Sequence, residues 1–451
     1  MKINPDIFKA YDIRGVYGQD FDETTFYSIA CVYAEIFKPV EPVIVSYDVR
    51  LSSPSLQKAV IDGLTDSGVD VVDIGLASTE MYYFAVGQYK MAGGLMITAS
   101  HNPQEYNGLK MVAKDVVPIH KDNGIFQIRD MVVGDWLPTP ALRKGSVVTR
   151  AVLDDFCDFA VQFLDESAKV PQKIVINPNF GFEGEVVKRF VQKNNLPWQL
   201  IGLNDLPDGT FPKGRPDPFV PENRPEFVAL TKSTGADFGV AWDADADRVF
   251  FCDDQGRFIE SYYINNLLIK SLLADKPNEI IVYDPRYTWA LIDAAKSVGA
   301  KAVMERVGHS YIKESMRHNN AIFAGESSGH TYFRDFWYAD SGLLPVLVLV
   351  NLLAKAGQPL SELIQPVFDQ YPMSGELNST VADVAAVLAR IESKYADGKI
   401  EHFDGLSIEF SDWRFSLRSS NTEPLLRLNI EARTEALVTE KVAEMLAIIR
   451  S

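Results

Sequence analysis

Three aspartates alternate with small residues in the segment Asp243-Ala-Asp-Ala-Asp-Arg248, which follows a largely apolar run over 238–242. The spacing predicts that Asp243, Asp245 and Asp247 lie on a tight loop at the end of a strand, where alternate carboxylates can converge on one hard cation. Ligands that are all oxygen suit Mg²⁺. The segment is not an EF-hand, because the glycine and the distal glutamate of that motif are missing. The alternative is a solvated acidic turn, although three acids with no compensating charge among them would repel one another.

A second candidate is Ser100 in Thr98-Ala-Ser-His-Asn-Pro103, which follows the apolar run 93–97. A serine is a poor nucleophile unless something activates it. His101 is not expected to act easily as its base, because the side chains of adjacent residues seldom face each other. A metal could activate Ser100, or the serine could already carry phosphate. The alternative is a polar turn between a strand and a helix, with an ordinary capping serine.

The segment Gly325-Glu-Ser-Ser-Gly-His330 matches G-x-S-x-G, the nucleophile elbow of serine hydrolases. Asp335, Asp340 and His402 follow Ser327 in a permissible order. A helix should begin directly after such an elbow, but the next residues, up to Tyr338, are rich in aromatic side chains. The alternative is a polar loop in which Glu326 and Ser328 form hydrogen bonds with vicinal hydroxyl groups.

A fourth polar segment, Arg418-Ser-Ser-Asn-Thr-Glu-Pro-Leu-Leu-Arg427, lies between two expected strands near the C-terminus. Arginine, hydroxyls, an amide and backbone N–H groups in one turn could cradle a phosphate. The alternative is an ordinary polar hairpin loop. The sequence contains no Walker A motif, no G-x-G-x-x-G and no H-E-x-x-H, so neither a nucleotide site nor a zinc site is predicted.

The elements that must position these loops recur along the chain. Short, apolar and β-branched runs that end in Asp or Asn stand at 43–50, 174–181 and 280–287. Each predicts a buried strand of a mostly parallel sheet, and each is followed by a helical pattern and then by a second apolar run. The second runs end at Ser100, at Asp243 and at Glu326. We therefore expect one α/β unit used three times, with its chemistry beyond the end of a strand, where open α/β sheets place ligands.

The C-terminal part follows a different pattern. Residues 406–410, 413–417 and 425–430 alternate like antiparallel strands, and a helix with Val438, Val442, Met445, Leu446 and Ile449 on one face follows them. The predicted fold is thus α/β, with three similar domains of mixed sheets and a smaller C-terminal α+β domain. The expected domains are 1–150 (serine loop), 151–255 (metal loop), 256–367 (the loop with Glu326) and 368–451 (phosphate cradle).

Composition narrows the class of protein. The formal net charge of −17 argues against nucleic acid and anionic membrane as partners. The apolar stretch from Leu343 to Ala354 is too short to span a bilayer and predicts a buried helix. Cys31, Cys157 and Cys252 are sparse and form no CxxC, which suits buried thiols in a reducing compartment, and no signal peptide is recognised. We expect a cytoplasmic protein.

The four polar loops occur in the order and spacing of the α-D-phosphohexomutase superfamily, and the chain resembles its members over nearly its whole length. Two further motifs are similar to those of the bacterial phosphomannomutase and phosphomannomutase/phosphoglucomutase branch. Phe8-Lys-Ala-Tyr-Asp-Ile-Arg-Gly15 matches the opening motif of that branch, and Asn107-Gly-Leu-Lys110 matches its lysine segment. The resemblance implies four domains around a central cleft.

The resemblance also implies roles for individual residues. Ser100 would be a phosphoserine whose phosphate completes the Mg²⁺ shell of Asp243, Asp245 and Asp247, with Arg248, Arg14 and Tyr11 beside it. Glu326 and Ser328 would hold sugar hydroxyls, and His330, Lys110 and His101 are the candidate acids and bases. The non-reacting phosphate would be held by Arg418, Ser420, Asn421, Thr422 and Arg427.

Val307-Gly-His-Ser-Tyr-Ile-Lys313 resembles the third-domain specificity loop of the family, which would bring His309 and Lys313 near the substrate. Arg286 stands where relatives often carry a basic residue. The metal loop departs slightly from the family pattern, because relatives often have glycine in place of Ala244 or Ala246. Alanine is small enough to leave the metal prediction standing, but the loop should be less permissive.

The activity that the resemblance implies is interconversion of mannose 6-phosphate and mannose 1-phosphate through phosphoserine and a hexose 1,6-bisphosphate. Mg²⁺ would be the metal, and glucose or mannose 1,6-bisphosphate the activator. Glucose phosphate as the substrate, or as a second one, is the alternative. Two further hypotheses come from other classes: a serine hydrolase that uses Ser327, and a non-catalytic sugar-phosphate binder. The expected assembly is a monomer or weak dimer.

Overall fold

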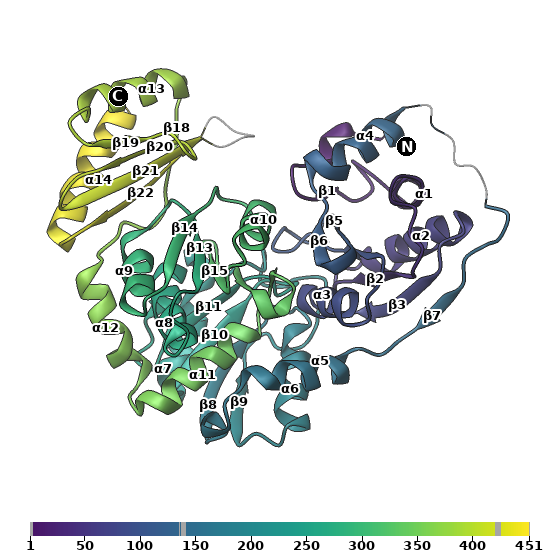
Figure 1. Ribbon diagram of the computed structural model, residues 1–451, viewed down its shortest axis with the longest axis horizontal. Coiled ribbons are helices and arrows are strands. Elements are labelled where there is room, and N and C mark those ends of the chain that lie inside the picture. The colour runs from purple at the N-terminus through teal and green to yellow at the C-terminus, as the bar shows by residue number, and fades with distance from the viewer. Residues whose placement is uncertain (1–2, 135, 137–140, 420–424, 451) are drawn as a thin grey trace. The chain divides into compact units, whose positions relative to one another are not determined.

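The computed structural model describes residues 3–134, 136, 141–419 and 425–450 (Figure 1). The chain divides into two compact units. The first unit is Met1–Ile259 with Ser328–Gly357, and the second is Glu260–Ser327 with Gln358–Ser451.

The N-terminal part of the first unit is a mixed seven-stranded sheet flanked by helices. Its order is β1-β5-β4-β2-β3-β7, with β6 beside β5. The strands are β1 (Ile13–Val16), β2 (Val43–Tyr47), β3 (Val71–Leu76), β4 (Gly93–Ile97), β5 (Tyr106–Ala113), β6 (Val117–Pro118) and β7 (Val147–Thr149). The helices are α1 (Glu23–Phe37), α2 (Ser53–Asp66), α3 (Thr79–Gln88) and α4 (Phe126–Val133). β2, β3, β4 and β7 run parallel, and β4 is buried along its whole length, as expected for a strand covered on both faces.

A second sheet of the first unit has the order β12-β11-β10-β8-β9. Its strands are β8 (Gln172–Asn177), β9 (Trp198–Gly202), β10 (Phe238–Trp242), β11 (Val249–Asp253) and β12 (Phe258–Ile259). The helices beside it in sequence are α5 (Leu153–Ala160), α6 (Glu183–Lys193) and α7 (Pro225–Thr234). The unit also contains the antiparallel pair β16 (Thr331–Phe333) and β17 (Ala339–Asp340), and the helix α11 (Leu344–Ala356).

The second unit holds β13 (Ile280–Tyr283) between its parallel partners β14 (Lys301–Met304) and β15 (Phe323–Gly325). Its helices in this part are α8 (Ser261–Leu273), α9 (Trp289–Ser297), α10 (His309–Asn319) and α12 (Leu360–Gln370). The C-terminal part is an antiparallel sheet of order β18-β22-β21-β20-β19 with two helices. Its elements are β18 (Leu377–Thr380), α13 (Val384–Lys394), β19 (Lys399–Glu401), β20 (Leu406–Glu409), β21 (Trp413–Ser419), β22 (Leu425–Ala432) and α14 (Glu435–Ile449).

The predicted fold class is confirmed: three α/β domains precede a smaller α+β domain. The repeated runs at 43, 174 and 280 begin or lie in β2, β8 and β13, and each of these strands has its next two parallel strands on opposite sides. The boundaries of the four domains stay a prediction. The expected third domain, 256–367, contributes residues to both compact units.

The apolar stretch near residue 343 forms α11, which is buried from Leu344 to Asn351. In the described part of the chain, no single helix is long and apolar enough to cross a membrane. Only α11 and α12 taken together, as a sharply bent pair, pass that test by length and composition.

One buried carboxylate connects β22 to the α/β part of the second unit. Glu431 accepts hydrogen bonds from Arg414 Nη1 at 2.8 Å, from the backbone N–H of Thr288 at 2.8 Å and from Tyr262 Oη at 2.5 Å. Glu431 and Arg414 are both buried. The C-terminal sheet is therefore fixed to its neighbour by a desolvated ion pair that is sensitive to loss of either partner.

We expect Glu431→Gln to destabilise the second unit by about 3–5 kcal/mol, because Arg414 keeps its charge but loses its anionic partner in a buried site. The measurement is urea denaturation followed by tryptophan fluorescence. Glu440→Gln on α14, whose side chain is 65% exposed, is the control and should change stability by no more than about 0.5 kcal/mol. Equal denaturation midpoints for the two variants would contradict this interpretation.

Candidate active site

Two loops meet at the carboxyl ends of β4 and β10, both in the first unit. Ser100 Oγ donates a hydrogen bond to Asp243 Oδ2 at 2.7 Å, although 143 residues separate them. Thr98 Oγ1 and Thr79 Oγ1 donate to Asp245 Oδ2 at 3.0 and 2.9 Å. The serine loop and the acidic loop, predicted separately from the sequence, thus form one site.

The three acids of the second loop converge. One oxygen of each of Asp243, Asp245 and Asp247 lies within 4.8 Å of the other two, and all three residues are buried. Asp245 Oδ1 and Asp247 Oδ1 have no hydrogen-bond partner in the described residues. Buried acceptors without donors are costly, and clustered carboxylate oxygens are the ligands that a hard divalent cation prefers. The residues present therefore fit a divalent metal site.

The backbone of this loop carries a local strain. Ala246 has φ +59°, in the left-handed region that favours glycine. An alanine in that region costs about 1 kcal/mol or more relative to glycine.

Lys110 and His330 lie against the same acids. Lys110 Nζ, from β5, is 2.7 Å from Asp245 Oδ2 and 2.5 Å from Asp247 Oδ2, and His330 Nε2 is 3.6 Å from Asp247 Oδ2. Burial acts to lower the pKa of Lys110, but Asp245 and then Asp247 outweigh burial and raise it. Lys110 is therefore a charged donor in this arrangement and cannot accept a proton while it is paired.

The acids differ from one another electrostatically. Burial, followed by repulsion from Asp247 and Asp245, raises the pKa of Asp243 well above its usual range. Burial also acts to raise the pKa of Asp247, but Lys110 and then His330 outweigh it and hold this pKa well below its usual range. The negative charge in the pocket therefore concentrates beside Lys110.

The expectation that His101 would not face Ser100 is wrong. His101 Nδ1 lies 3.0 Å from Ser100 Oγ. The reason is the backbone: Ser100 has φ +47°, and this left-handed residue folds the chain so that the two neighbouring side chains meet. Burial, then Arg248 and Arg14, lower the pKa of His101 well below its usual range. The imidazole is thus neutral at pH 7 and can exchange a proton with the serine.

Sequence reasoning missed the residue that holds the serine loop. Arg50, at the turn after β2, is buried and pairs through Nε with Asp48 Oδ2 at 3.1 Å. Its two terminal nitrogens donate to the backbone carbonyls of Ser100 (2.7 Å), Asn102 (2.7 Å), Pro103 (2.6 Å) and Tyr106 (3.0 Å). The available signal was a pair of opposite charges, two residues apart, directly after a buried strand.

Two other arginines present unused donors near the serine. Arg14, on β1, donates to Asn102 Oδ1 at 2.8 Å, and the backbone N–H of Arg248 donates to Asp243 Oδ1 at 3.2 Å. The Nε atoms of both arginines are buried without a partner in the part of the chain that the structure describes. Unpaired guanidinium N–H groups suit an anion such as phosphate. Tyr11 lies three residues before Arg14, in the turn that leads into β1.

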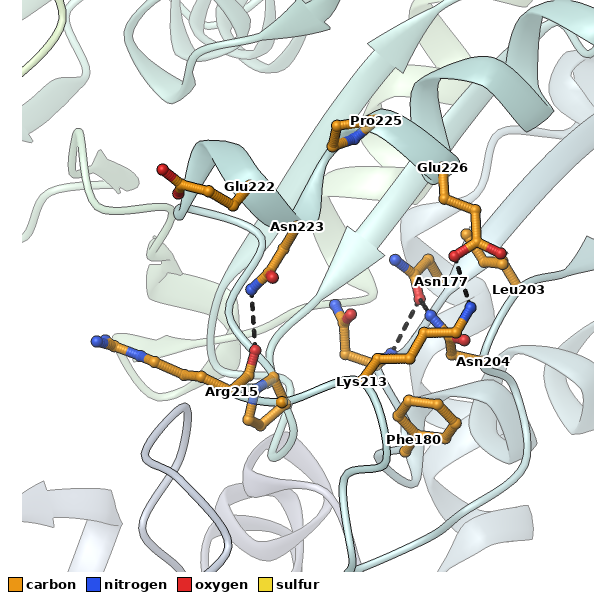
Figure 2. A pocket seen from close by; sticks show the side chains of 13 residues that line it. Asn177, Phe180, Leu203, Asn204, Lys213, Arg215, Glu222, Asn223, Pro225 and Glu226 are labelled. Atoms are coloured by element: carbon orange, nitrogen blue, oxygen red, sulfur yellow. Dashed lines mark hydrogen bonds and ion pairs between the residues drawn. The ribbon is translucent and has the colours of Figure 1, made fainter.

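A third arginine, Arg215, was also missed. Its Nε donates to the carbonyl oxygen of His101 at 3.1 Å, and its guanidinium pairs with Asp217 at 2.7 Å. Arg215 lies at the rim of a cavity of about 300 Å³ at the ends of β8 and β9. In Figure 2, Arg215 and Lys213 extend from one loop in opposite directions, and Lys213 reaches Glu226.

The polar groups of this cavity are largely paired with one another. Asn177 Oδ1 accepts from Asn204 Nδ2 and from the backbone N–H of Asn179, and Asn223 Nδ2 donates to the carbonyl of Arg215 (Figure 2). These bonds hold the loop that carries Arg215.

The candidate sugar-binding residues fall in both units. In the second unit, Glu326 follows β15, is buried, and lies 3.5 Å from Arg286 Nη2, while Arg286 also pairs with Asp284 at 2.9 Å. In the first unit, Ser328 Oγ lies 3.1 Å from His330 Nδ1. A carboxylate, a hydroxyl and an imidazole are groups that can bind sugar hydroxyls.

The geometry around Ser327 does not fit a nucleophile elbow. The next regular element after Ser327 is the strand β16, where an elbow requires a helix. Ser327 Oγ donates weakly to Asp284 at 3.4 Å, and His402 is held by Glu392 at 3.1 Å. The contacts of Ser327 thus lack the histidine that a hydrolase needs.

The specificity segment and the cradle both lie in the second unit. His309 is the first residue of α10, and Lys313 is buried on the same helix. Arg418 and Arg427 stand directly opposite each other on β21 and β22, where they pair with Asp404 at 2.9 Å and Glu376 at 3.8 Å. Like charges directly opposite on a sheet are unfavourable unless an anion compensates them. The remaining cradle residues, Ser420, Asn421 and Thr422, lie outside the described residues.

Comparison with known proteins identifies the family. Four models of the phosphoglucomutase/phosphomannomutase family match successive parts of the chain. They are α/β/α domain I at residues 5–142, domain II at 154–256, domain III at 260–371 and the C-terminal domain at 376–448. The chain belongs to this family, within the α-D-phosphohexomutase superfamily. It is an isomerase that acts on a hexose phosphate.

Individual relatives are similar to this chain over nearly their full lengths. The chain is 43% identical to a protein of Xanthomonas campestris described as phosphohexose mutases, over 96% of each chain. It is 40% identical to a phosphomannomutase of Salmonella montevideo, over 99% of this chain and 100% of that one. A crystal structure of a phosphoglucomutase/phosphomannomutase family protein from Burkholderia thailandensis superposes with a TM-score of 0.88 at 32% identity, over 99% and 98% of the two chains.

We expect Arg50→Met to destabilise the first unit by about 3–5 kcal/mol, because Asp48 is left as an unpaired buried charge. Four carbonyls of the serine loop also lose their donor, so activity should fall even where the protein remains folded. The measurement is the urea midpoint together with the rate of turnover. Arg143→Met is the matched control, because its ion pair with Asp70 is exposed and contributes at most about 1 kcal/mol. A stable, fully active Arg50→Met variant would refute this role.

Proposed function

We propose that the protein is a phosphomannomutase that interconverts mannose 6-phosphate and mannose 1-phosphate. The observation that carries this proposal is the contact of Ser100 with Asp243 in a buried cluster of acids, in a chain about 40% identical to several bacterial phosphomannomutases along its whole length. Glucose phosphate as the substrate, or as a second one, is the alternative. Mannose and glucose differ only at C2, whereas a Glu326/Ser328 pair is expected to bind O3 and O4.

Ser100 would carry the phosphate that is transferred. Phosphoserine gives its phosphate to one end of the sugar, which yields a hexose 1,6-bisphosphate, and the other phosphate of that intermediate then returns to Ser100. The same bisphosphate, of glucose or mannose, would serve as activator by phosphorylating Ser100. Because the intermediate must turn over between the two steps, its non-reacting phosphate needs its own site. We assign that site to Arg418, Arg427 and the segment 420–422.

We propose Mg²⁺ as the metal, held by Asp243, Asp245, Asp247 and the phosphate on Ser100. Bound there, it would neutralise charge on the transferring phosphoryl group. The unpartnered oxygens of Asp245 and Asp247 support this assignment, and Lys110 compensates the same acids with its ammonium group.

The chain's own residues would supply the remaining chemistry. Arg14 and Arg248 would bind the phosphate at Ser100 through their unpaired Nε–H groups. His330 would exchange a proton with the attacking or leaving sugar hydroxyl, while Lys110, already charged, would act as a donor. His309, Lys313 and Arg286 would contribute to substrate recognition, and Tyr11 would flank the phosphoserine.

We further propose that the protein works in the cytoplasm as a monomer or weak dimer. The three cysteines support a reducing compartment, because all of them are free and buried. Burial raises the pKa of Cys157 and of Cys252 to about 12, so both thiols stay protonated and unreactive.

The central test is Ser100→Ala. The intact mass of the purified wild type, incubated with glucose 1,6-bisphosphate, should show one added phosphate that the variant cannot take up. Turnover of mannose 1-phosphate in a coupled assay should fall by at least about 10³-fold. Ser327→Ala is the control, since a hydrolase would lose activity in that variant. Full mutase activity in Ser100→Ala would refute the proposal, and saturable binding without turnover in the wild type would indicate a binder.

Parallel assays of mannose 1-phosphate and glucose 1-phosphate measure the sugar preference. We expect the larger kcat/KM for the mannose compound. A larger value for the glucose compound would favour the phosphoglucomutase alternative.

The metal assignment is tested by Asp243→Asn. Chelation should abolish turnover in the wild type, and added Mg²⁺ should restore it. The variant should bind Mn²⁺ about 10-fold or more weakly in equilibrium dialysis, because an anionic ligand becomes neutral. Asp205→Asn, which removes an ion pair with Lys188 in the same part of the chain, is the control. Unchanged Mn²⁺ binding by Asp243→Asn would contradict the assignment.

A further inference from the structure

Two glutamates that the proposed reaction does not use are completely buried next to each other. Glu80 is the second residue of α3, and Glu183 is the first residue of α6. Both side chains have 0% exposure, and both belong to the first unit. Two ionised carboxylates in such a site would repel each other strongly and lack solvation.

Several polar atoms around this pair have no hydrogen-bond partner among the described residues. Glu80 Oε2 accepts from Ser341 Oγ and, at 3.0 Å, from the backbone N–H of Leu343. Glu80 Oε1, both oxygens of Glu183 and Ser78 Oγ receive no partner among the described residues when the carboxyls are treated as acceptors. Yet the Glu183 side chain lies against Glu80, close enough for one carboxyl to bond to the other.

A proton on Glu183 supplies the donor that the two carboxyls lack. The protonated carboxyl donates to Glu80 Oε1, which otherwise has no partner among the described residues. Buried polar groups in folded proteins are nearly always paired, so this protonation state is strongly favoured over two bare carboxylates.

The proton belongs on Glu183 and not on Glu80. Glu80 already accepts two hydrogen bonds, which stabilise its ionised form. Burial, and then the charge of Glu80, raise the pKa of Glu183 well above its usual range. The other titratable group that faces Glu183 is the Cys157 thiol of α5, which is neutral. The N-terminus of α6 favours the ionised form, but by only about 1 kcal/mol.

The pair lies directly behind the candidate metal site. Thr79, next to Glu80, donates its backbone N–H to the carbonyl of Asp245 at 2.8 Å and its hydroxyl to Asp245 Oδ2 at 2.9 Å. Gly342, between the two residues that bind Glu80, approaches the acidic loop so closely that an added Cβ would lie 2.6 Å from the carbonyl oxygen of Ala246. The start of α3 is therefore held by the acidic loop on one side and by the glutamate pair on the other.

We propose that Glu183 remains protonated at neutral pH and donates a hydrogen bond to Glu80 that positions the start of α3, and through Thr79 the Asp245 carboxylate. Glu80 and Glu183 are thus positioning residues for the metal-binding loop. The link to catalysis rests on the proposed function, whereas the protonation of Glu183 does not.

The first experiment detects the proton directly. Infrared spectra at neutral pH should show the C=O stretching band of a protonated carboxyl in the wild type. Glu183→Gln should remove that band, while its amide keeps a donor for Glu80. Glu185→Gln on the same helix, whose side chain is 41% exposed and pairs with Lys188, should leave the band in place. Identical spectra for the wild type and Glu183→Gln would overturn the proposal.

The second experiment follows stability with pH. The folded protein holds a proton on Glu183 that the unfolded chain releases above its ordinary pKa of 4.5. This contribution to stability is complete below that value and declines as the pH rises towards the folded-state pKa, by up to about tenfold in the folding equilibrium constant per pH unit. Glu183→Gln lacks this term, so its urea midpoint should rise relative to the wild type as the pH increases above that ordinary value. Parallel profiles for the two proteins would overturn the proposal.

The third experiment tests positioning without turnover. Glu183→Gln should bind Mn²⁺ as tightly as the wild type, whereas Glu183→Ala, which leaves Glu80 Oε1 without a donor, should bind it several-fold more weakly. Equal Mn²⁺ affinity in the wild type and Glu183→Ala would show that the pair does not position the metal loop. Should the wild type lack mutase activity, the proposed function would fail, while the infrared and denaturation results would still decide the state of Glu183.

Discussion

The burial of three carboxylates on one short loop is the constraint on which the first unit depends. Two unit charges about 4 Å apart repel by about 4 kcal/mol at an effective dielectric constant of about 20, so the loop cannot stay buried without positive charge and donors. Lys110 comes from β5, Thr79 from the start of α3 and Thr98 from the end of β4. Two strands of the first sheet and one helix beside it therefore compensate a loop of the second sheet. The same requirement makes the loop a good cation site, because Asp245 and Asp247 each retain an oxygen without a partner.

In the acidic loop buried negative charges attract donors, whereas in the serine loop neutral backbone carbonyls surround one buried cation, the guanidinium of Arg50. Arg50 binds four carbonyl oxygens of this loop and is neutralised by Asp48 from its own turn. The carbonyls of the loop point to Arg50, and Ser100 in its left-handed conformation presents its hydroxyl to Asp243 and His101. A phosphate on Ser100 would then meet arginine donors and a metal in place of backbone oxygens. This explains how one serine among many can become a phosphate carrier.

Much of the fold could be predicted from the sequence because the signals are local. Buried parallel strands are continuous apolar runs, and β2, β8 and β13 occur where such runs were found. The motif residues follow the ends of β4, β10 and β15, as expected for open α/β sheets. The prediction about His101 failed because it assumed ordinary backbone geometry, whereas Ser100 is left-handed and its carbonyl has the support of Arg50. That support joins segments about fifty residues apart and leaves no periodic pattern.

The sequence by itself determined the residue types of the site, the strands that end at them and, through the resemblance, the family. The residue types and the strands follow from composition, periodicity and spacing, which are properties of neighbouring residues, and the family follows from the similarity of the four motifs. Only the tertiary structure decided which groups meet: Arg50 with the serine loop, Lys110 with Asp245 and Asp247, and Glu183 with Glu80. Their charge and protonation states depend on burial and on partners distant along the chain, because the free energy of a buried charge is set by what surrounds it in space.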